Sequence, residues 1–164
     1  MRVLGVDCGT ECTGYAVVEQ THDGELVSRS WGGIRLRPQE PLPNRLLTVH
    51  EKLAEIISFH QPDEVAIEDV FYSINAKSAL KLGQVRGVAM LTAAQAGLPV
   101  AEYAPLTIKS AVVGYGRAEK SQVQEMVTRL LRLTAPPEPA DAADALAIAI
   151  CHLHTAATIV RQGG

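Results

Sequence analysis

Residues 2–18 read RVLGVDCGTECTGYAVV, and this stretch decides the fold class. It opens with a short apolar run at residues 2–6, continues through the turn-forming residues 7–10, and ends in a second β-prone run at residues 13–18. A third such run covers residues 26–36. Three strands joined by short connections predict an antiparallel meander at the start of the chain.

The pattern becomes helical after Pro41 and Pro43. Apolar residues recur at helical spacing over residues 46–59, and Pro62 ends this pattern. The β-prone run at residues 65–67 follows a helix long enough to be a crossover, so we expect it to lie parallel to the first strand. The remaining patterns predict a strand over residues 99–103 and helices over residues 75–96, 119–133 and 140–154. The sequence therefore predicts a single α/β domain over residues 1–164, with a mixed five-stranded sheet flanked by helices.

Composition limits the class of protein. A chain of 164 residues that is 47% hydrophobic fits one compact domain. Its three cysteines are odd in number and lack metal-finger spacing, which favours a reduced, cytoplasmic compartment. The N-terminus has no apolar stretch long enough for a signal peptide, and the uncharged run at residues 87–101 is too short to cross a bilayer. We expect no membrane association.

Charge is distributed unevenly along the chain. The net charge of −3, taken alone, counts against a nucleic-acid partner. Within residues 71–118, however, Glu102 is the only acid among five basic residues, so this segment carries +4 and the remainder carries −7. A solvated basic face and a phosphate-binding surface both fit this segment.

Two predicted strands each end on an acid, Asp7 and Glu68. Ligands gather beyond the carboxyl ends of strands in such sheets, and neighbouring strands lie only about 5 Å apart. Asp141 and Asp144 are three residues apart on the last predicted helix, so both project from one face at roughly 5–6 Å spacing. Four acids can therefore converge on one point. Asp69 points to the opposite side of its strand from Glu68, and we expect it to be structural.

A site built only from carboxylates favours a hard cation, Mg²⁺ or Mn²⁺ in its place. Two such ions about 4 Å apart serve phosphodiester hydrolysis, in which one activates a water and the other stabilises the leaving oxygen. Each acid also has an ordinary structural explanation, because strand-end acids form turns and acids near a helix start interact favourably with the helix dipole. An unpaired Asp144 among alanines on a close-packing helix face would be costly.

Five segments resemble the RuvC family of bacterial Holliday junction resolvases, and they cover the chain nearly end to end. They read VDCGTECTGYAVV, AIEDVF, SALKLGQVRG, GRAEKSQVQ and DAADALAIAI. The resemblance implies a ribonuclease H-like fold and a nuclease that resolves four-way junction DNA by paired symmetric nicks. It places the family's catalytic, metal-binding carboxylates on Asp7, Glu68, Asp141 and Asp144.

The resemblance also implies partners and DNA contacts. The family is a homodimer, and association with the RuvA-RuvB branch-migration complex is expected for it. Gly83 and Gly87, four residues apart on one predicted helix, suit close helix approach at a dimer interface, or else packing against the chain's own sheet. Family DNA contacts fall on Phe71, Lys109 and Lys120. The basic segment adds the phosphate-contact candidates Lys77, Lys81, Arg86 and Arg117.

Two departures from the family pattern are Cys8, where proline is common, and Glu11, where a basic or neutral residue is usual. Neither departure removes a predicted metal ligand.

Three other functions stay open on the sequence alone. The D-x-G-T hairpin also resembles that of sugar-kinase or actin-like ATPases, although these need two such domains. A nuclease of the same fold that matures ribosomal RNA and a junction-binding protein without catalysis are the other two.

Overall fold

The computed structural model describes residues 1–69 and 75–161. Within these residues the chain forms one mixed five-stranded sheet with the strand order β3-β2-β1-β4-β5. The strands are β1 (Arg2–Asp7), β2 (Cys12–Gln20), β3 (Leu26–Arg35), β4 (Glu64–Glu68) and β5 (Val100–Tyr103). The helices are α1 (Leu42–His60), α2 (Ala76–Gln95), α3 (Pro105–Val113), α4 (Lys120–Leu130) and α5 (Ala140–Arg161).

The predicted meander and crossover are both confirmed. β1 pairs antiparallel with β2, which pairs antiparallel with β3. β4 returns to pair parallel with β1, and β5 pairs parallel with β4. β1 is buried on both faces, which explains why its sequence is an almost continuous apolar run instead of an alternating one. This arrangement brings the carboxyl ends of β1 and β4 to the same edge of the sheet.

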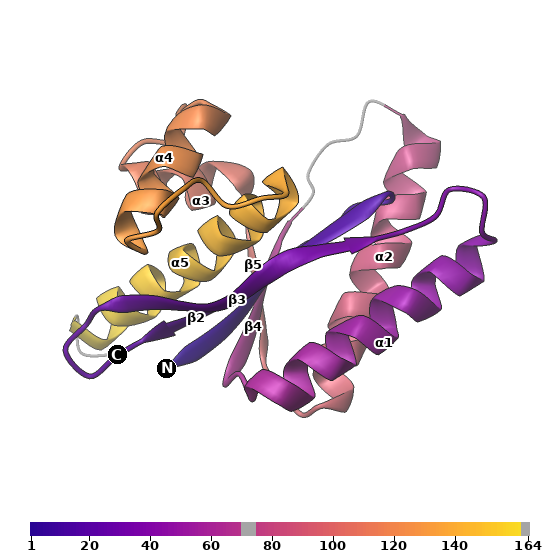
Figure 1. Cartoon of the computed structure of the whole chain (residues 1–164), viewed down its shortest axis with the longest axis horizontal. Helices are drawn as coiled ribbons and strands as arrows, with labels where there is room; N and C mark the ends of the chain where they lie inside the picture. Colours follow the sequence, from indigo (N-terminus) through magenta and orange to yellow (C-terminus); the bar gives the residue numbers. More distant parts are fainter. Residues whose placement is uncertain (70–74, 162–164) are drawn as a thin grey trace.

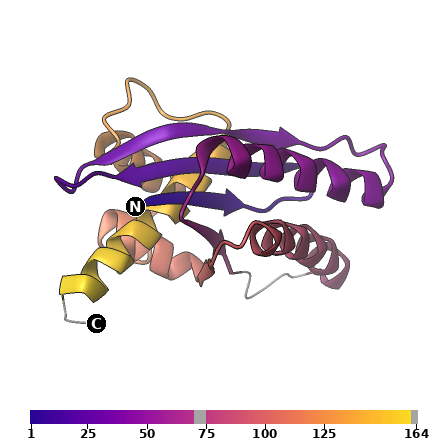
Figure 2. The same cartoon turned by 90° about the horizontal axis from the view of Figure 1, so that it is seen from below.

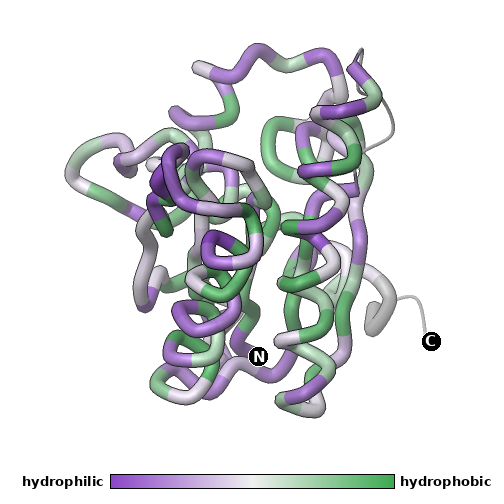
Figure 3. The backbone as a smooth tube through the Cα atoms, turned by 90° about the vertical axis from the view of Figure 1, so that its right-hand side faces the viewer, coloured by the Kyte–Doolittle hydropathy of each residue, from purple (hydrophilic) through white to green (hydrophobic). Residues whose placement is uncertain are grey.

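Helices cover both faces of the sheet and bury two separate hydrophobic clusters. α1 and α2 lie on one side, and α3, α4 and α5 lie on the other (Figures 1 and 2). Leu4, Val17 and Leu53 belong to the cluster under α1 and α2, whereas Val3 and Leu146 belong to the cluster under α5. The hydropathy colouring of Figure 3 alternates along the long helices, as expected for helices with one buried face.

The helix α5 packs unusually close to the sheet because β1 carries a glycine beneath it. A Cβ atom placed on Gly5 would lie 2.2 Å from the backbone oxygen of Ala145 and 2.9 Å from the backbone nitrogen of Ala149. Farther along α5, His152 is hydrogen-bonded through Nδ1 to the Tyr103 hydroxyl (2.8 Å) and through Nε2 to the Glu64 carboxylate (2.9 Å). Close packing and these bonds fix the direction of α5 across the sheet.

Helix boundaries differ from the sequence prediction in four places. α1 begins at Leu42, four residues earlier than predicted, because proline is tolerated in the first turn of a helix, where its missing N–H has no intrahelical partner. α3 was not predicted. α4 ends earlier than the predicted 119–133, and α5 continues past the predicted end at residue 154. Each difference lies outside the strand ends that carry Asp7 and Glu68.

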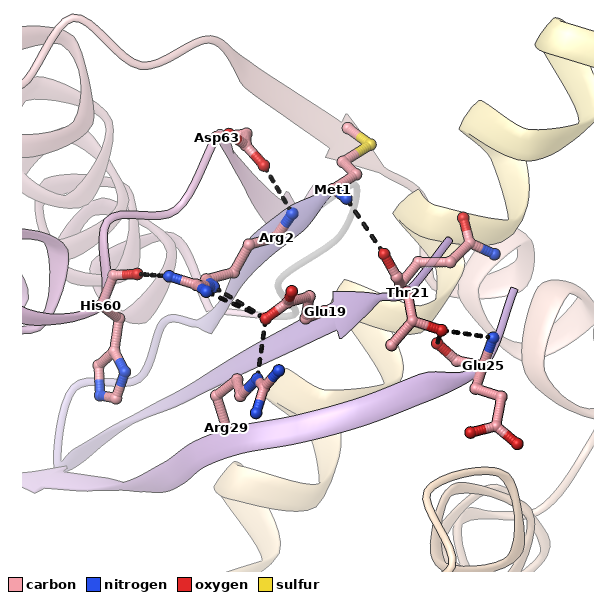
Figure 4. Close-up of polar contacts among 9 residues, drawn as sticks. Met1, Arg2, Glu19, Thr21, Glu25, Arg29, His60 and Asp63 are labelled. Carbon is pink, nitrogen blue, oxygen red and sulfur yellow. Dashed lines mark hydrogen bonds and ion pairs between the residues drawn. The ribbon is translucent and has the colours of Figure 1, made fainter. Parts of the chain in front are cut away.

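Arg2 holds the sheet together at the opposite end of β1 from Asp7. Arg2 bonds the Glu19 carboxylate through Nε (3.2 Å) and Nη2 (3.0 Å), and its Nη1 donates to the backbone oxygen of His60 (Figure 4). It thereby joins β1 to β2 and to the last turn of α1. Among the described residues, no helix combines the length and apolar character needed to cross a membrane.

Candidate active site

Asp7 and Glu68 stand side by side at one edge of the sheet. Asp7 is the last residue of β1 and Glu68 the last of β4, and the preceding residues Val6 and Ile67 are register partners in the parallel pair. Side chains alternate along a strand, and Gly5 faces α5, so Asp7 projects toward the same helix. The strand-end prediction for these two acids agrees with their placement.

The first turn of α5 brings the second pair of acids to the same edge. Gly14 on β2 is the register partner of Asp7, and a Cβ atom on Gly14 would lie 2.0 Å from the backbone oxygen of Asp141. Burial, and then the charge of the nearby Asp141 carboxylate and its hydrogen bonding, raise the pKa of Cys12 to about 11. Asp141 therefore rests on the strand next to Asp7, with Asp144 one turn farther along the helix.

The other three acids lie close enough to Asp7 for their negative charges to affect its pKa. Burial raises the pKa of Asp7 to about 8, and the negative charges of Asp144, Glu68 and Asp141 contribute to this rise, while Lys120 opposes it. Burial and then the charge of Asp144 also raise the pKa of Glu68. Carboxylates crowded in this way repel one another unless a cation lies between them.

Two of the acids and two lysines line one small pocket. Glu68, Asp144, Lys109 and Lys120 line a cavity of about 180 Å³, whose apolar wall comes from α3, α4 and α5. Lys120 donates through Nζ to Asp144 Oδ2 at 2.8 Å, and this hydrogen bond is the main cause of the raised pKa of Lys120. Asp144 is thus paired, which removes the cost that an unpaired acid on this helix face would carry.

The chemistry of the acids fits a divalent cation, although their side chains are not gathered around one in this conformation. Throughout residues 1–69 and 75–161, no three His, Cys, Asp or Glu side chains stand in an arrangement that holds a metal ion. Instead, the Lys120 ammonium supplies the positive charge at Asp144. Four oxygen donors that repel one another are nevertheless the set that Mg²⁺ and Mn²⁺ prefer.

The predicted DNA-contact residues lie in different settings. Lys77 and Arg117 are exposed, Lys81 and Lys109 are half-buried, and Lys120 is 60% exposed. Phe71 lies outside the described residues. Arg86 is only 16% exposed and is bound within the protein to Glu68, Asp69 and Glu102, so its predicted contact with phosphate loses its support. Asp69 is structural, as expected, through its ion pair with Arg86.

Two residues at this edge, Cys12 and Gly14, were not singled out from the sequence as parts of the site, and Arg86 was predicted there only as a phosphate contact. Cys12 and Gly14 contact Asp141, and the backbone of Glu68 is held by Arg86. A glycine within a β-prone run was an available signal for Gly14, because glycine in a strand often marks close approach of another backbone. No local signal existed for the pairing of Arg86.

Comparison with known proteins identifies the family. A family model described as "Crossover junction endodeoxyribonuclease RuvC" matches residues 3–152. The RuvC protein of Koribacter versatilis is 60% identical over 162 residues, which cover 99% of this chain and 98% of that protein. The RuvC protein of Acidobacterium capsulatum is 60% identical over 168 residues, again covering 99% and 98%.

Solved structures of Holliday junction resolvases share the fold of this chain. The structure of Thermus thermophilus RuvC in complex with a Holliday junction substrate matches with a TM-score of 0.92 and 34% identity, over 96% of each chain. The yeast mitochondrial Holliday junction resolvase Ydc2, only 14% identical, shares the fold with a TM-score of 0.68, over 97% of this chain and 82% of that one. The fold is ribonuclease H-like, as the sequence resemblance implied. The chain belongs to the RuvC family of crossover junction endodeoxyribonucleases.

Proposed function

We propose that residues 1–164 form one nuclease domain that resolves four-way DNA junctions, with Asp7, Glu68, Asp141 and Asp144 as its catalytic carboxylates. One observation carries this assignment: Asp7 is partly buried, the other three acids lie close enough for their charges to act on it, and its pKa is raised to about 8. Such an arrangement is costly to the fold unless a cation neutralises it, and perturbed acids of this kind cluster at functional sites. The Holliday junction complex of the Thermus thermophilus relative supports the choice of substrate.

RuvC nucleases are metal-dependent. We propose that the four carboxylates hold Mg²⁺, with Mn²⁺ as an effective substitute and two ions per site. Held by these carboxylates, such ions would supply the activation of a water and the stabilisation of the leaving oxygen in phosphodiester hydrolysis. Asp7 and Glu68, fixed on the sheet, set the position of the site, and Asp141 and Asp144 close it from α5.

Lys120 has two roles in this proposal. In the metal-free protein it neutralises Asp144, and once Asp144 serves as a ligand its ammonium turns to the DNA phosphate. Lys109 lines the same pocket, and its charge opposes the rise in the pKa of Glu68, so it favours the ionised form of that carboxylate. Phe71 remains a candidate for contact with bases near the crossover, on the sequence resemblance alone. Lys77, Lys81 and Arg117 remain candidates for phosphate contact.

Replacing Lys120 with Ala is expected to weaken junction binding and to reduce its salt dependence. Loss of one phosphate contact lowers the slope of log K against log salt concentration by about 1. Fluorescence anisotropy with a labelled junction over a series of salt concentrations measures this. Lys52→Ala is the matched control, because Lys52 pairs with Glu55 on α1, across the sheet from the site. An unchanged slope in Lys120→Ala would remove Lys120 from the DNA interface.

We propose a homodimer formed through α2. Gly83 and Gly87 are exposed, and among residues 1–69 and 75–161 a Cβ atom on either would have nothing within 4 Å, so these glycines do not pack against the chain's own sheet. Leu80 and Leu91 on the same helix are 70% and 56% exposed. A small-residue stripe between exposed leucines allows a second α2 to approach closely, and a two-fold enzyme matches a pseudo-two-fold junction.

Gly87→Glu is expected to give a folded monomer, because the added side chain has open space in one protomer but meets its partner in the dimer. Size-exclusion chromatography with light scattering gives the mass. Gly87→Ala is the matched control and should remain dimeric. A Gly87→Glu protein with the wild-type mass would contradict this interface.

Cytoplasmic localisation, which the cysteine pattern favours, is a further part of the proposal, as is association with the RuvA-RuvB branch-migration complex, which rests on the family alone. The activity itself is tested by incubating the protein with a synthetic four-way junction, a linear duplex, a DNA–RNA hybrid and a structured ribosomal RNA, each with Mg²⁺ or Mn²⁺. We expect paired nicks in the junction only. Cleavage of RNA, or junction binding without cleavage, would support the rival functions instead, as would ATP hydrolysis in a parallel assay.

A further inference from the structure

The guanidinium of Arg86 ties α2 to the end of β4 and to β5, beside the active site. Its Nε donates to the backbone oxygen of Glu68 at 3.1 Å. Its Nη2 forms an ion pair with the Glu102 carboxylate on β5 and lies 3.5 Å from Asp69 Oδ1. The Arg86 side chain is 16% exposed, whereas the Asp69 and Glu102 side chains are 33% and 41% exposed, so the guanidinium is largely buried and its carboxylate partners face solvent.

These bonds fix the peptide unit that follows the Glu68 side chain. The carbonyl of this unit accepts from Arg86, and its N–H, which belongs to Asp69, donates to the backbone oxygen of Tyr103 at 2.8 Å. Both polar groups of one peptide are therefore bonded in opposite directions, which orients its plane. The orientation of that plane sets the backbone dihedral at Glu68 and hence the direction in which its carboxylate leaves the strand.

The same contacts argue against a role for Arg86 at the DNA. Two carboxylates already face its guanidinium, so the group and its partners together carry a net negative charge. Removing this arginine would leave the half-buried Asp69 and the exposed Glu102 without their shared counter-charge and the Glu68 carbonyl without its donor. Within the part of the chain described, Arg86 has the surroundings of a positioning residue.

We propose that Arg86 is the positioning residue for Glu68: it holds the Glu68 peptide so that the carboxylate points into the metal site. This rests on the proposed function, in which Glu68 is a ligand. Outer residues that orient a ligand typically contribute a factor of about 10 to 100 in metal affinity, and a displacement of about 1 Å at a reacting centre costs about 100-fold in rate.

Arg2 provides a matched control within the same chain. It also joins two strands and a helix through a backbone carbonyl and a carboxylate, but it does so at the start of β1, whereas Asp7 ends that strand (Figure 4). Five residues of extended strand separate the two ends, about 17 Å. Loss of Arg2 therefore tests the fold without disturbing the metal site.

The experiment compares Arg86→Ala, Arg86→Lys and Arg2→Ala. Mn²⁺ affinity is measured without DNA from the electron paramagnetic resonance signal of free Mn²⁺. Junction affinity is measured without divalent ions, and the cleavage rate is measured at saturating junction. For Arg86→Ala we expect Mn²⁺ affinity about 10-fold weaker and cleavage about 100-fold slower, with junction affinity unchanged. Arg86→Lys, which keeps one donor and the charge, should recover part of both losses. Arg2→Ala should lower only the melting temperature.

Two results would overturn the proposal. One is wild-type Mn²⁺ affinity and cleavage in Arg86→Ala; the other is weaker junction binding with a shallower salt slope and an unchanged rate, which would make Arg86 a phosphate contact. If Arg86→Ala does not fold, Glu102→Gln tests the same set of Arg86 contacts, because it removes the charge of one partner of the guanidinium. We expect a smaller loss of Mn²⁺ affinity and of cleavage rate. No change in either quantity would contradict the proposal. Glu68→Gln distinguishes failure of the proposed metal site from failure of the positioning role. A fully active Glu68→Gln protein would refute the proposed site. An inactive Glu68→Gln protein together with a fully active Arg86→Ala protein would refute only the positioning role of Arg86.

Discussion

Replacing Asp7 with Asn is expected to abolish junction cleavage while leaving junction binding intact. An amide is a poorer ligand for a hard cation than a carboxylate, and Asp7 is the acid whose pKa burial and the other three carboxylates raise to about 8. Loss of metal-assisted charge stabilisation at the phosphate costs several kcal/mol in the barrier, so a decrease of at least about 1000-fold in rate is expected. Rates come from labelled-junction gels, and affinities come from anisotropy without divalent ions.

The same substitution should stabilise the metal-free protein at neutral and higher pH. The folded pKa of Asp7 is about 8 and its ordinary value is 3.8, so the folded state binds the proton more tightly than the unfolded state. Stability of the wild type therefore falls as pH rises from about 4 to about 8, and the full penalty applies above that range. The amide of the Asp7→Asn variant cannot ionise, so denaturant unfolding without divalent ions should show a gain on the order of a few kcal/mol at pH 8 and little gain at pH 4.

Asp23→Asn is the matched control, since Asp23 is exposed in the turn between β2 and β3. It should leave both cleavage and the pH profile of unfolding unchanged. Adding Mg²⁺ should stabilise the wild type, because binding to the folded state alone raises its stability, but should stabilise Asp7→Asn much less. An Asp7→Asn protein that cleaves junctions at the wild-type rate would contradict the assignment of Asp7 as a ligand.

Gly14→Ala is expected to damage both the fold and the active site. Its Cβ would lie 2.0 Å from the backbone oxygen of Asp141 and 2.4 Å from its carbonyl carbon, so the clash is with the backbone of α5 and no side-chain rotation relieves it. The first turn of α5 must move, and Asp141 and Asp144 move with it. Overpacking of this kind costs about 1–3 kcal/mol of stability, and a displacement of about 1 Å costs about 100-fold in cleavage rate.

Gly32→Ala serves as the control for a glycine elsewhere in the same sheet. The nearest atoms to a Cβ on Gly32 would be the ring and hydroxyl of Tyr15, a side chain that can shift. We expect a small loss of melting temperature and an unchanged cleavage rate. A Gly14→Ala protein with the stability and rate of the wild type would show that α5 does not rest on β2 as described.

Local patterns predicted the parts of the site that lie on strands. Asp7 and Glu68 each end a run of apolar residues, and the helical pattern between those runs implied a parallel crossover, which brings the two strand ends together. The three-residue spacing of Asp141 and Asp144 similarly predicted one helix face. These predictions succeeded because hydrophobic periodicity and connection length decide which strands are neighbours.

Contacts between distant segments could not be predicted in this way. The nine-residue helix α3 is too short to be stable alone, and its Ile108 and Val112 are buried by packing that the local sequence does not encode. Lys120 and Asp144 are 24 residues apart, and Arg86 meets acids from two different strands. The basic segment predicted positive charge near the site. Only the tertiary structure shows that Arg86 is bound to Glu68, Asp69 and Glu102 within the protein, whereas Lys109 and Lys120 face the acids of the proposed site.

The metal site is tested most directly by anomalous diffraction from crystals of the wild-type protein grown with Mn²⁺. If the four carboxylates are the ligands, anomalous peaks should lie between the ends of β1 and β4 and the first turn of α5, with Asp7 and at least one other of the four acids at about 2.0–2.2 Å. A protein that takes up Mn²⁺ only elsewhere, with these four carboxylates uncoordinated, would contradict the proposed active site.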